Sequence, residues 1–142
     1  MNGKPLPDDD HVIRYCKPTA VEDDLPSVSA FKIRANEDHL SVNWLEYFGV
    51  LDRPTAVQRI REAFHAKGFQ LRKNGRFAVL NVDDIRSIAQ DIAYNSLRVE
   101  HLPLEDDPSH AGILGYSPED IAIATEIKAL VGIEDVYRAL SK

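Results

Sequence analysis

Hydrophobic residues recur along the chain with two different spacings, which together predict a mixture of strands and helices. Runs of β-branched and aromatic residues, or apolar residues that alternate with polar ones, are typical of strands. Such patterns predict strands at residues 11–16, 28–34, 77–82, 97–102 and 111–114. The second of these segments alternates most regularly, with Phe31 and Ile33 on one face and Lys32 and Arg34 on the other.

Apolar residues spaced three or four apart predict the helices. The clearest case is residues 55–67, where Val57, Ile60 and Phe64 would share one face. Thr55 stands at the start of this segment and is expected to cap the helix. Further helical patterns cover residues 40–48 with Asn43 as cap, 83–93 with Asp83 or Asp84 as cap, 117–131 with Ser117 as cap, and a terminal piece at 134–140.

The dipeptide Asn74-Gly75 lies between two apolar runs and predicts a tight β-hairpin. Both central residues of such a turn adopt positive φ, which Asn and Gly tolerate well. We therefore expect residues 69–72 and 77–82 to form two antiparallel strands.

The order of these elements predicts a single α+β domain. Strands and helices are interspersed without a regular strand–helix–strand rhythm, which favours a mixed or mainly antiparallel sheet with about four helices. The polar, proline-containing residues 1–10 are expected to form a flexible tail that lacks the apolar core of a secretory signal, and residues 11–142 the globular domain.

Length and cysteine content indicate the compartment. A chain of 142 residues fits one domain that buries enough surface to fold without a disulfide or a metal. Cys16 is the only cysteine, which suits a reducing compartment, so a cytoplasmic location is expected. We read Cys16 as a small buried hydrophobic residue rather than a nucleophile. One cysteine and five scattered histidines predict no structural metal and no cofactor, and no stretch approaches 18 apolar residues, so no membrane association is expected.

The charge distribution limits the partners. The net charge is −6, with acidic clusters at residues 8–10, 22–24 and 105–107, and this balance disfavours binding to generic duplex DNA. A basic stretch at residues 59–76 runs against the trend. It is either the solvated side of its predicted elements or a local surface that faces an anion.

Two residues are unusual for a purely structural role. Arg14 interrupts an apolar strand, so its guanidinium must bind an anion, pair with an internal carboxylate or reach solvent. His110 precedes the small residues Ala111 and Gly112 at the start of an apolar strand, where a general acid/base or a ligand donor would fit. The alternative for His110 is a local hydrogen bond to a carboxylate such as that of Asp107.

Four segments of the sequence resemble a diffuse group of small uncharacterised bacterial proteins. The segments are Arg14-Tyr15, Ser29-Ala30-Phe31, Leu40-Ser41-Val42 and Asp107-Pro108-Ser109-His110-Ala111-Gly112-Ile113. The resemblance implies a bacterial origin and singles out Arg14, Ser29, Ser41 and His110 as a set, without indicating a reaction.

These observations leave two hypotheses for function. In the first, the chain is an enzyme or ligand-binding domain that recognises a phosphate-bearing anion. Arg14 would hold the anion, His110 would act as general acid/base or donor, and Ser29 or Ser41 would orient the ligand. In the second, the chain is a protein-interaction module, such as an antitoxin, an immunity protein or an accessory protein of a defence system. Its acidic surface would then meet a basic partner, and a homodimer is also possible.

Overall fold

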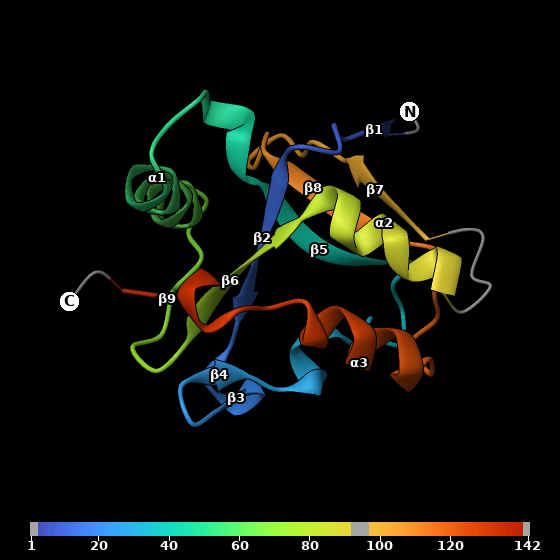
Figure 1. Ribbon diagram of the computed structural model, residues 1–142. Coiled ribbons are helices and arrows are strands. Elements are labelled where there is room, and N and C mark those ends of the chain that lie inside the picture. The colour runs from blue at the N-terminus through green and yellow to red at the C-terminus, as the bar shows by residue number, and fades with distance from the viewer. Residues whose placement is uncertain (1–2, 92–96, 141–142) are drawn as a thin grey trace.

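A seven-stranded sheet runs through the part of the chain that the computed structural model describes, residues 3–91 and 97–140 (Figure 1). Its strand order is β1-β7-β8-β5-β2-β6-β9, and the neighbouring strands pair in antiparallel fashion. The strands are β1 (Lys4–Pro5), β2 (His11–Cys16), β5 (His39–Trp44), β6 (Arg76–Asn81), β7 (Arg98–His101), β8 (His110–Leu114) and β9 (Val136–Arg138). A separate two-stranded ribbon consists of β3 (Val21–Glu22) and β4 (Leu25–Pro26).

Three α-helices lie within the described residues, so the α+β class is confirmed with three helices in place of about four. They are α1 (Arg53–Ala66), α2 (Val82–Asp91) and α3 (Ile121–Ala129). Short 3-10 segments are η1 (Pro18–Ala20), η2 (Val28–Phe31), η3 (Leu45–Phe48) and η4 (Ile133–Asp135). None of the helices in these ranges has the length and hydrophobicity needed to cross a membrane.

Different helices cover the two faces of the sheet, so the protein has two cores. Successive side chains of a strand point to opposite faces. Val12 of β2 packs in a core with Ile85 of α2 and Ile127 of α3, whereas Ile13 packs in a second core with Ile60 of α1. Figure 1 shows this division, with α1 on one side of β2 and β6 and with α2 and α3 on the other.

Residues 28–34 do not form the predicted strand. Val28–Phe31 is the 3-10 segment η2, in which Phe31 is fully buried. The backbone carbonyl of Phe31 accepts a 2.6 Å hydrogen bond from the hydroxyl of Tyr116, and η2 contacts α3. The alternation in this segment therefore reflects packing against α3, and the segment has no place in the sheet.

Residues 40–48 do not form the predicted helix. They contribute β5 (His39–Trp44), which continues directly into η3 (Leu45–Phe48). Leu40 and Val42 are buried in the larger core, and Ser41 between them points to the other face, so the decisive pattern has the period of a strand. Asn43 consequently lies within β5 and caps no helix.

The predicted hairpin around Asn74-Gly75 is also wrong. The chain turns there, with the amide of Gly75 donating to the carbonyl of Arg72, but residues 69–72 form no strand. The strand that follows, β6, instead lies between β2 and β9. Distant apolar strands compete successfully with the local partner because β2 and β6 pair along their whole length.

The C-terminal segment differs from the predicted helical piece at residues 134–140. It forms η4 and then β9, which pairs with the outer edge of β6.

The last two residues of the predicted helix 83–93 lie outside the described residues. The observed caps, with the predicted ones in parentheses, are Asp52 (Thr55), Asn81 (Asp83 or Asp84) and Asp120 (Ser117).

Part of the predicted flexible tail, residues 1–10, contacts the sheet. Lys4–Pro5 forms β1, which pairs with β7 at the edge of the sheet. The side chain of Leu6 is buried, and its amide donates to the carbonyl of Val99. Asp8 forms an ion pair with Arg86 of α2.

Candidate functional site

The central strands β2 and β5 pair over only part of their length. They are joined at Val12↔Trp44 and Ile13↔Asn43, and their pairing stops before Arg14. A cavity of about 380 Å³ lies where the strands diverge, lined on one side by Arg14, Tyr15 and Cys16 of β2 and on the other by Leu40, Ser41 and Asn43 of β5. The cavity is therefore built into the sheet itself, in the interval where the main-chain ladder is interrupted.

The side chain of Arg14 bridges this gap. Its Nε donates to the carbonyl of Ala30 and its Nη1 to the carbonyl of Ser41, each at 2.8 Å. Neither acceptor is a carboxylate, so the internal ion pair considered as an alternative is not formed. Among the described residues, Nη2 has no hydrogen-bond partner. Burial lowers the pKa of Arg14, and this poorly solvated cation would gain from an anion in the cavity.

His110 lies at the start of β8, opposite Asn43 of β5, and its side chain is largely buried. Its Nδ1 lies 2.8 Å from the carbonyl oxygen of Leu102, and because a carbonyl only accepts, Nδ1 carries the proton. In the neutral ring Nε2 is then an acceptor, and it lies 3.3 Å from Oγ of Ser41.

The surroundings of His110 favour its neutral form. Burial lowers the pKa of His110, and the hydrogen bond to Leu102 and the charge of Asp107 oppose this shift. His39 and Lys67 lower the pKa further. His110 is therefore an uncharged base at neutral pH. Its amide donates to the main-chain carbonyl of Asp107, but its ring makes no hydrogen bond to the carboxylate of Asp107, which accepts from Asn43 and Lys67.

All four candidate residues line the same cavity. Arg14, Ser29, Ser41 and His110 come from β2, η2, β5 and β8, respectively. Ser41 is in hydrogen-bond reach of His110, whereas the hydroxyl of Ser29 is 2.8 Å from that of Ser27. The structure thus places all four residues on one cavity, although they do not share one face of the sheet. By the register of the strands, Ser41 and His110 leave their strands on the α1 side, whereas Arg14 leaves β2 on the other side and reaches the gap between β2 and β5.

The lining is strongly basic although the chain is acidic. Among the described lining residues are five basic side chains, Arg14, Lys17, Lys32, Arg34 and Lys67, against one acidic side chain, Glu37. Lys17, Lys32 and Arg34 are exposed at the mouth. Lys67 is the member of the basic stretch 59–76 that lines the cavity. The formal charge of this lining is about +4, of which the buried carboxylate of Asp107 offsets the unit on Lys67, in a chain whose net charge is −6.

A buried polar network supports the floor of the cavity. The carboxylate of Asp107 is fully buried and accepts hydrogen bonds from Lys67 at 2.6 Å and from Asn43 at 2.9 Å. Asn43 also donates to the hydroxyl of Ser109 at 2.9 Å. This network ties the end of α1, strand β5 and the loop before β8 to one another. Sequence reasoning missed Lys67 and Asn43 because their partner lies 40 and 64 positions away, and no local pattern marks such a pairing.

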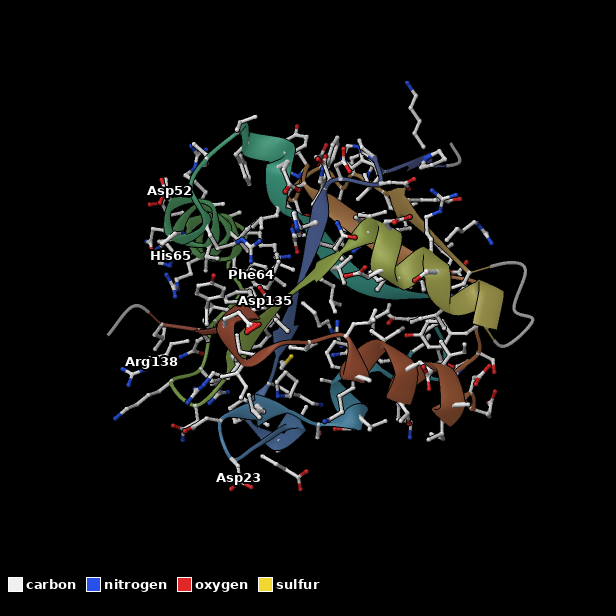
Figure 2. All side chains as sticks on the ribbon, viewed as in Figure 1. Asp23, Asp52, Phe64, His65, Asp135 and Arg138 are labelled. Atoms are coloured by element: carbon white, nitrogen blue, oxygen red, sulfur yellow. The ribbon has the colours of Figure 1, made fainter. Side chains whose placement is uncertain are left out.

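The remaining wall of the cavity is aromatic and apolar. It comprises Tyr15, Phe64, Phe69 and Leu104, of which Phe69 is 43% and Leu104 49% exposed. Phe64 points from α1 toward the sheet, whereas His65 beside it points away from the sheet (Figure 2). The cavity therefore combines one cationic side with one apolar side.

Cys16 lines the cavity, but its thiol is buried and unreactive. Burial raises the pKa of Cys16 to about 12, although the charge of Arg14 acts in the opposite direction. The thiolate fraction at pH 8 is then about 10³-fold below that of an ordinary cysteine. We expect iodoacetamide to alkylate the native protein at least about 10³-fold more slowly than the urea-unfolded protein, as measured by intact mass. A native rate within tenfold of the unfolded rate would contradict the buried placement.

Among the side chains that the structure describes, in residues 3–88 and 97–140, no three His, Cys, Asp or Glu gather closely enough to hold a metal ion. No protein-family model matches the chain, and neither a curated protein nor a solved structure shows significant similarity to it.

Proposed function

We propose that this protein binds a small phosphate-bearing anion in the cavity between β2 and β5. The observation that carries the proposal is the concentration of five basic side chains around a 380 Å³ cavity in a chain of net charge −6. Cavities of this size are typical of small-molecule sites. The positive field of the lining would also raise the local concentration of an anion and speed its entry.

The roles of the residues follow from their positions. Arg14 is the fixed donor, because two hydrogen bonds to main-chain carbonyls hold its guanidinium and leave Nη2 for the ligand. Lys17, Lys32 and Arg34 attract the anion at the mouth of the cavity. Ser41 and Ser29 offer hydroxyl groups inside it. In this proposal the protein works in the bacterial cytoplasm, where Cys16 stays a thiol.

Titration with inorganic pyrophosphate tests the proposal. We expect calorimetry at low ionic strength to detect binding to the unaltered protein, and we expect Arg14→Met to weaken it at least about tenfold. A hydrogen bond to a charged group is worth about 1.5–3 kcal/mol, which corresponds to roughly 10- to 100-fold in affinity. Binding should also weaken as salt is added, because the exposed part of the lining is screened.

Lys73→Ala is the matched control. Lys73 is an exposed cation that does not line the cavity, so this variant should bind pyrophosphate with unchanged affinity. Absence of binding at millimolar pyrophosphate would refute the proposal. Equal loss in both variants would show that general surface charge, and not the cavity, attracts the anion. That outcome would favour the interaction-module alternative.

A further inference from the structure

Ser41 and His110 form a hydrogen-bonded pair with a defined direction. The carbonyl of Leu102 fixes the proton of His110 on Nδ1, so the neutral ring accepts at Nε2. The group 3.3 Å away is the hydroxyl of Ser41, which must therefore be the donor. A serine that donates to an oriented neutral histidine is the arrangement that activates serine nucleophiles, and such contacts are often loose before substrate binds.

The local backbone holds this pair in place. Ser41 of β5 lies opposite Gly112 of β8 in the sheet, two positions beyond His110. A Cβ atom at Gly112 would lie 2.7 Å from Cδ1 of Leu102 and 3.0 Å from Cδ2 of His39. The absence of a side chain at Gly112 thus lets Leu102 and His39 close in beside His110, whose ring contacts that of His39 at a centroid distance of 5.5 Å. The ring of His110 is thus held by the carbonyl of Leu102 and packs against the ring of His39.

The guanidinium of Arg14 reaches the main chain of the same serine. Nη1 of Arg14 donates to the main-chain carbonyl of Ser41, so the guanidinium lies in the gap between β2 and β5, and its Nη2 has no hydrogen-bond partner among the described residues. The negative charge that develops on a phosphoryl group during attack would be offset there. The pair supplies a nucleophile and a base, and the cation reaches the same cavity from the other face of the sheet.

We propose that Ser41 is a nucleophile that attacks the phosphorus of a bound phosphate ester, with His110 as its general base. This inference rests on the proposed function. The bond from Ser41 Oγ to phosphorus forms while the bond from phosphorus to the ester oxygen breaks. The hydroxyl proton passes to Nε2 of His110 and from there to the departing alkoxide, which leaves as an alcohol. Water activated by His110 then cleaves the phosphoserine to serine and inorganic phosphate, or to a phosphate monoester when the substrate is a diester.

The reaction should depend on pH through His110. The charged and titratable groups that act on its ring are His39 from β5, Lys67 at the C-cap of α1 and Asp107 from the preceding loop. Arg14 of β2 contacts the main chain of Ser41 from the other face of the sheet. Only the neutral ring accepts the proton of Ser41, so the rate of attack should rise with pH through the pKa of His110. Burial lowers that pKa below 6.5, and the rate should therefore already be near its plateau at neutral pH.

Diisopropyl fluorophosphate tests the inference, since it traps a serine nucleophile at phosphorus with release of fluoride. It carries no charge, so its reaction does not require the anion site. We expect intact mass and peptide mapping to locate one adduct on Ser41 of the native protein. Ser41→Ala should abolish it, and His110→Gln should slow it at least about 100-fold, the lower end of what general base catalysis contributes. Ser87→Ala, on the exposed face of α2, is the control and should label as the unaltered protein does.

Failure of this test is distinguishable from failure of the anion site. No adduct on Ser41, or an unchanged rate in His110→Gln, would overturn the nucleophile while pyrophosphate binding could persist. The pH profile of labelling in the unaltered protein provides the same evidence without a variant, so a folding defect in His110→Gln does not obscure the result. A rate that does not fall as His110 becomes protonated below its pKa would also overturn the inference.

Discussion

Replacing Lys67 with methionine is expected to lower the free energy of unfolding by about 3–5 kcal/mol, because it leaves a buried carboxylate without its cation. The side chain of Asp107 is fully buried, and the ammonium of Lys67 lies 2.6 Å from Oδ2. In the variant, the described partners of this carboxylate are the neutral donors Asn43 and Ser109. Urea unfolding monitored by circular dichroism measures the loss.

Two further variants separate this pairing from a general effect of charge. Lys73→Met removes an exposed cation and should change stability by no more than about 0.5 kcal/mol. In the double variant Lys67→Met with Asp107→Asn, the uncompensated charge is gone, so part of the stability should return. A loss below about 1 kcal/mol for Lys67→Met alone would show that water reaches Asp107.

Phe77→Ala is expected to cost about 3–5 kcal/mol, through the cavity that it leaves in the second core. Phe77 is fully buried, and the centroid of its ring lies 5.5 Å from that of Tyr15 and 5.3 Å from that of Phe64. Both neighbours line the ligand cavity, so the substitution should weaken pyrophosphate binding as well as stability.

The control for Phe77 is Ile133→Ala. Ile133 is 76% exposed in η4, and its truncation should change stability by at most about 0.5 kcal/mol. Equal losses of stability in the two variants would show that the packing between α1 and the sheet contributes less to the free energy of unfolding than the burial of Phe77 indicates.

The elements predicted well from sequence are those whose local pattern agrees with their tertiary surroundings. Strand β2, helix α1 and strand β8 each occur where the apolar spacing placed them. Residues 40–48 also contain Trp44, Leu45 and Phe48 at a helical spacing, which favours a helix in place of β5. Only the last part of that segment coils, as η3, while Leu40 and Val42 obey the period of the sheet.

Pairing between distant segments explains most of the remaining differences. The turn at Gly75 exists, but β6 finds its partners in β2 and β9 rather than in residues 69–72. A local turn signal carries no information about that competition.

The residues of the candidate site also divide into those that a local sequence pattern marks and those that only the fold brings together. Arg14 and His110 could be selected from sequence because each stands out within an apolar strand, and both line the cavity. Lys67, Asn43 and Lys32 could not, because a lysine in a basic stretch or an asparagine near a predicted helix start is ordinary until the fold brings it to the cavity. The basic character of the cavity is equally invisible in a net charge of −6.

The gap between β2 and β5 also determines how the site forms during folding. Its contacts close long stretches of chain, since Arg14 and Ser41 are 27 positions apart, Lys67 and Asp107 are 40, and Ser41 and His110 are 69. Each closure costs loop entropy before any contact contributes, although a doubling of loop length adds only about 0.6 kcal/mol. No local segment therefore contains a precursor of the cavity. A fragment that begins after Arg14 or ends before His110 lacks a member of the site, and occupancy by a ligand reports that β2, β5 and β8 have assembled.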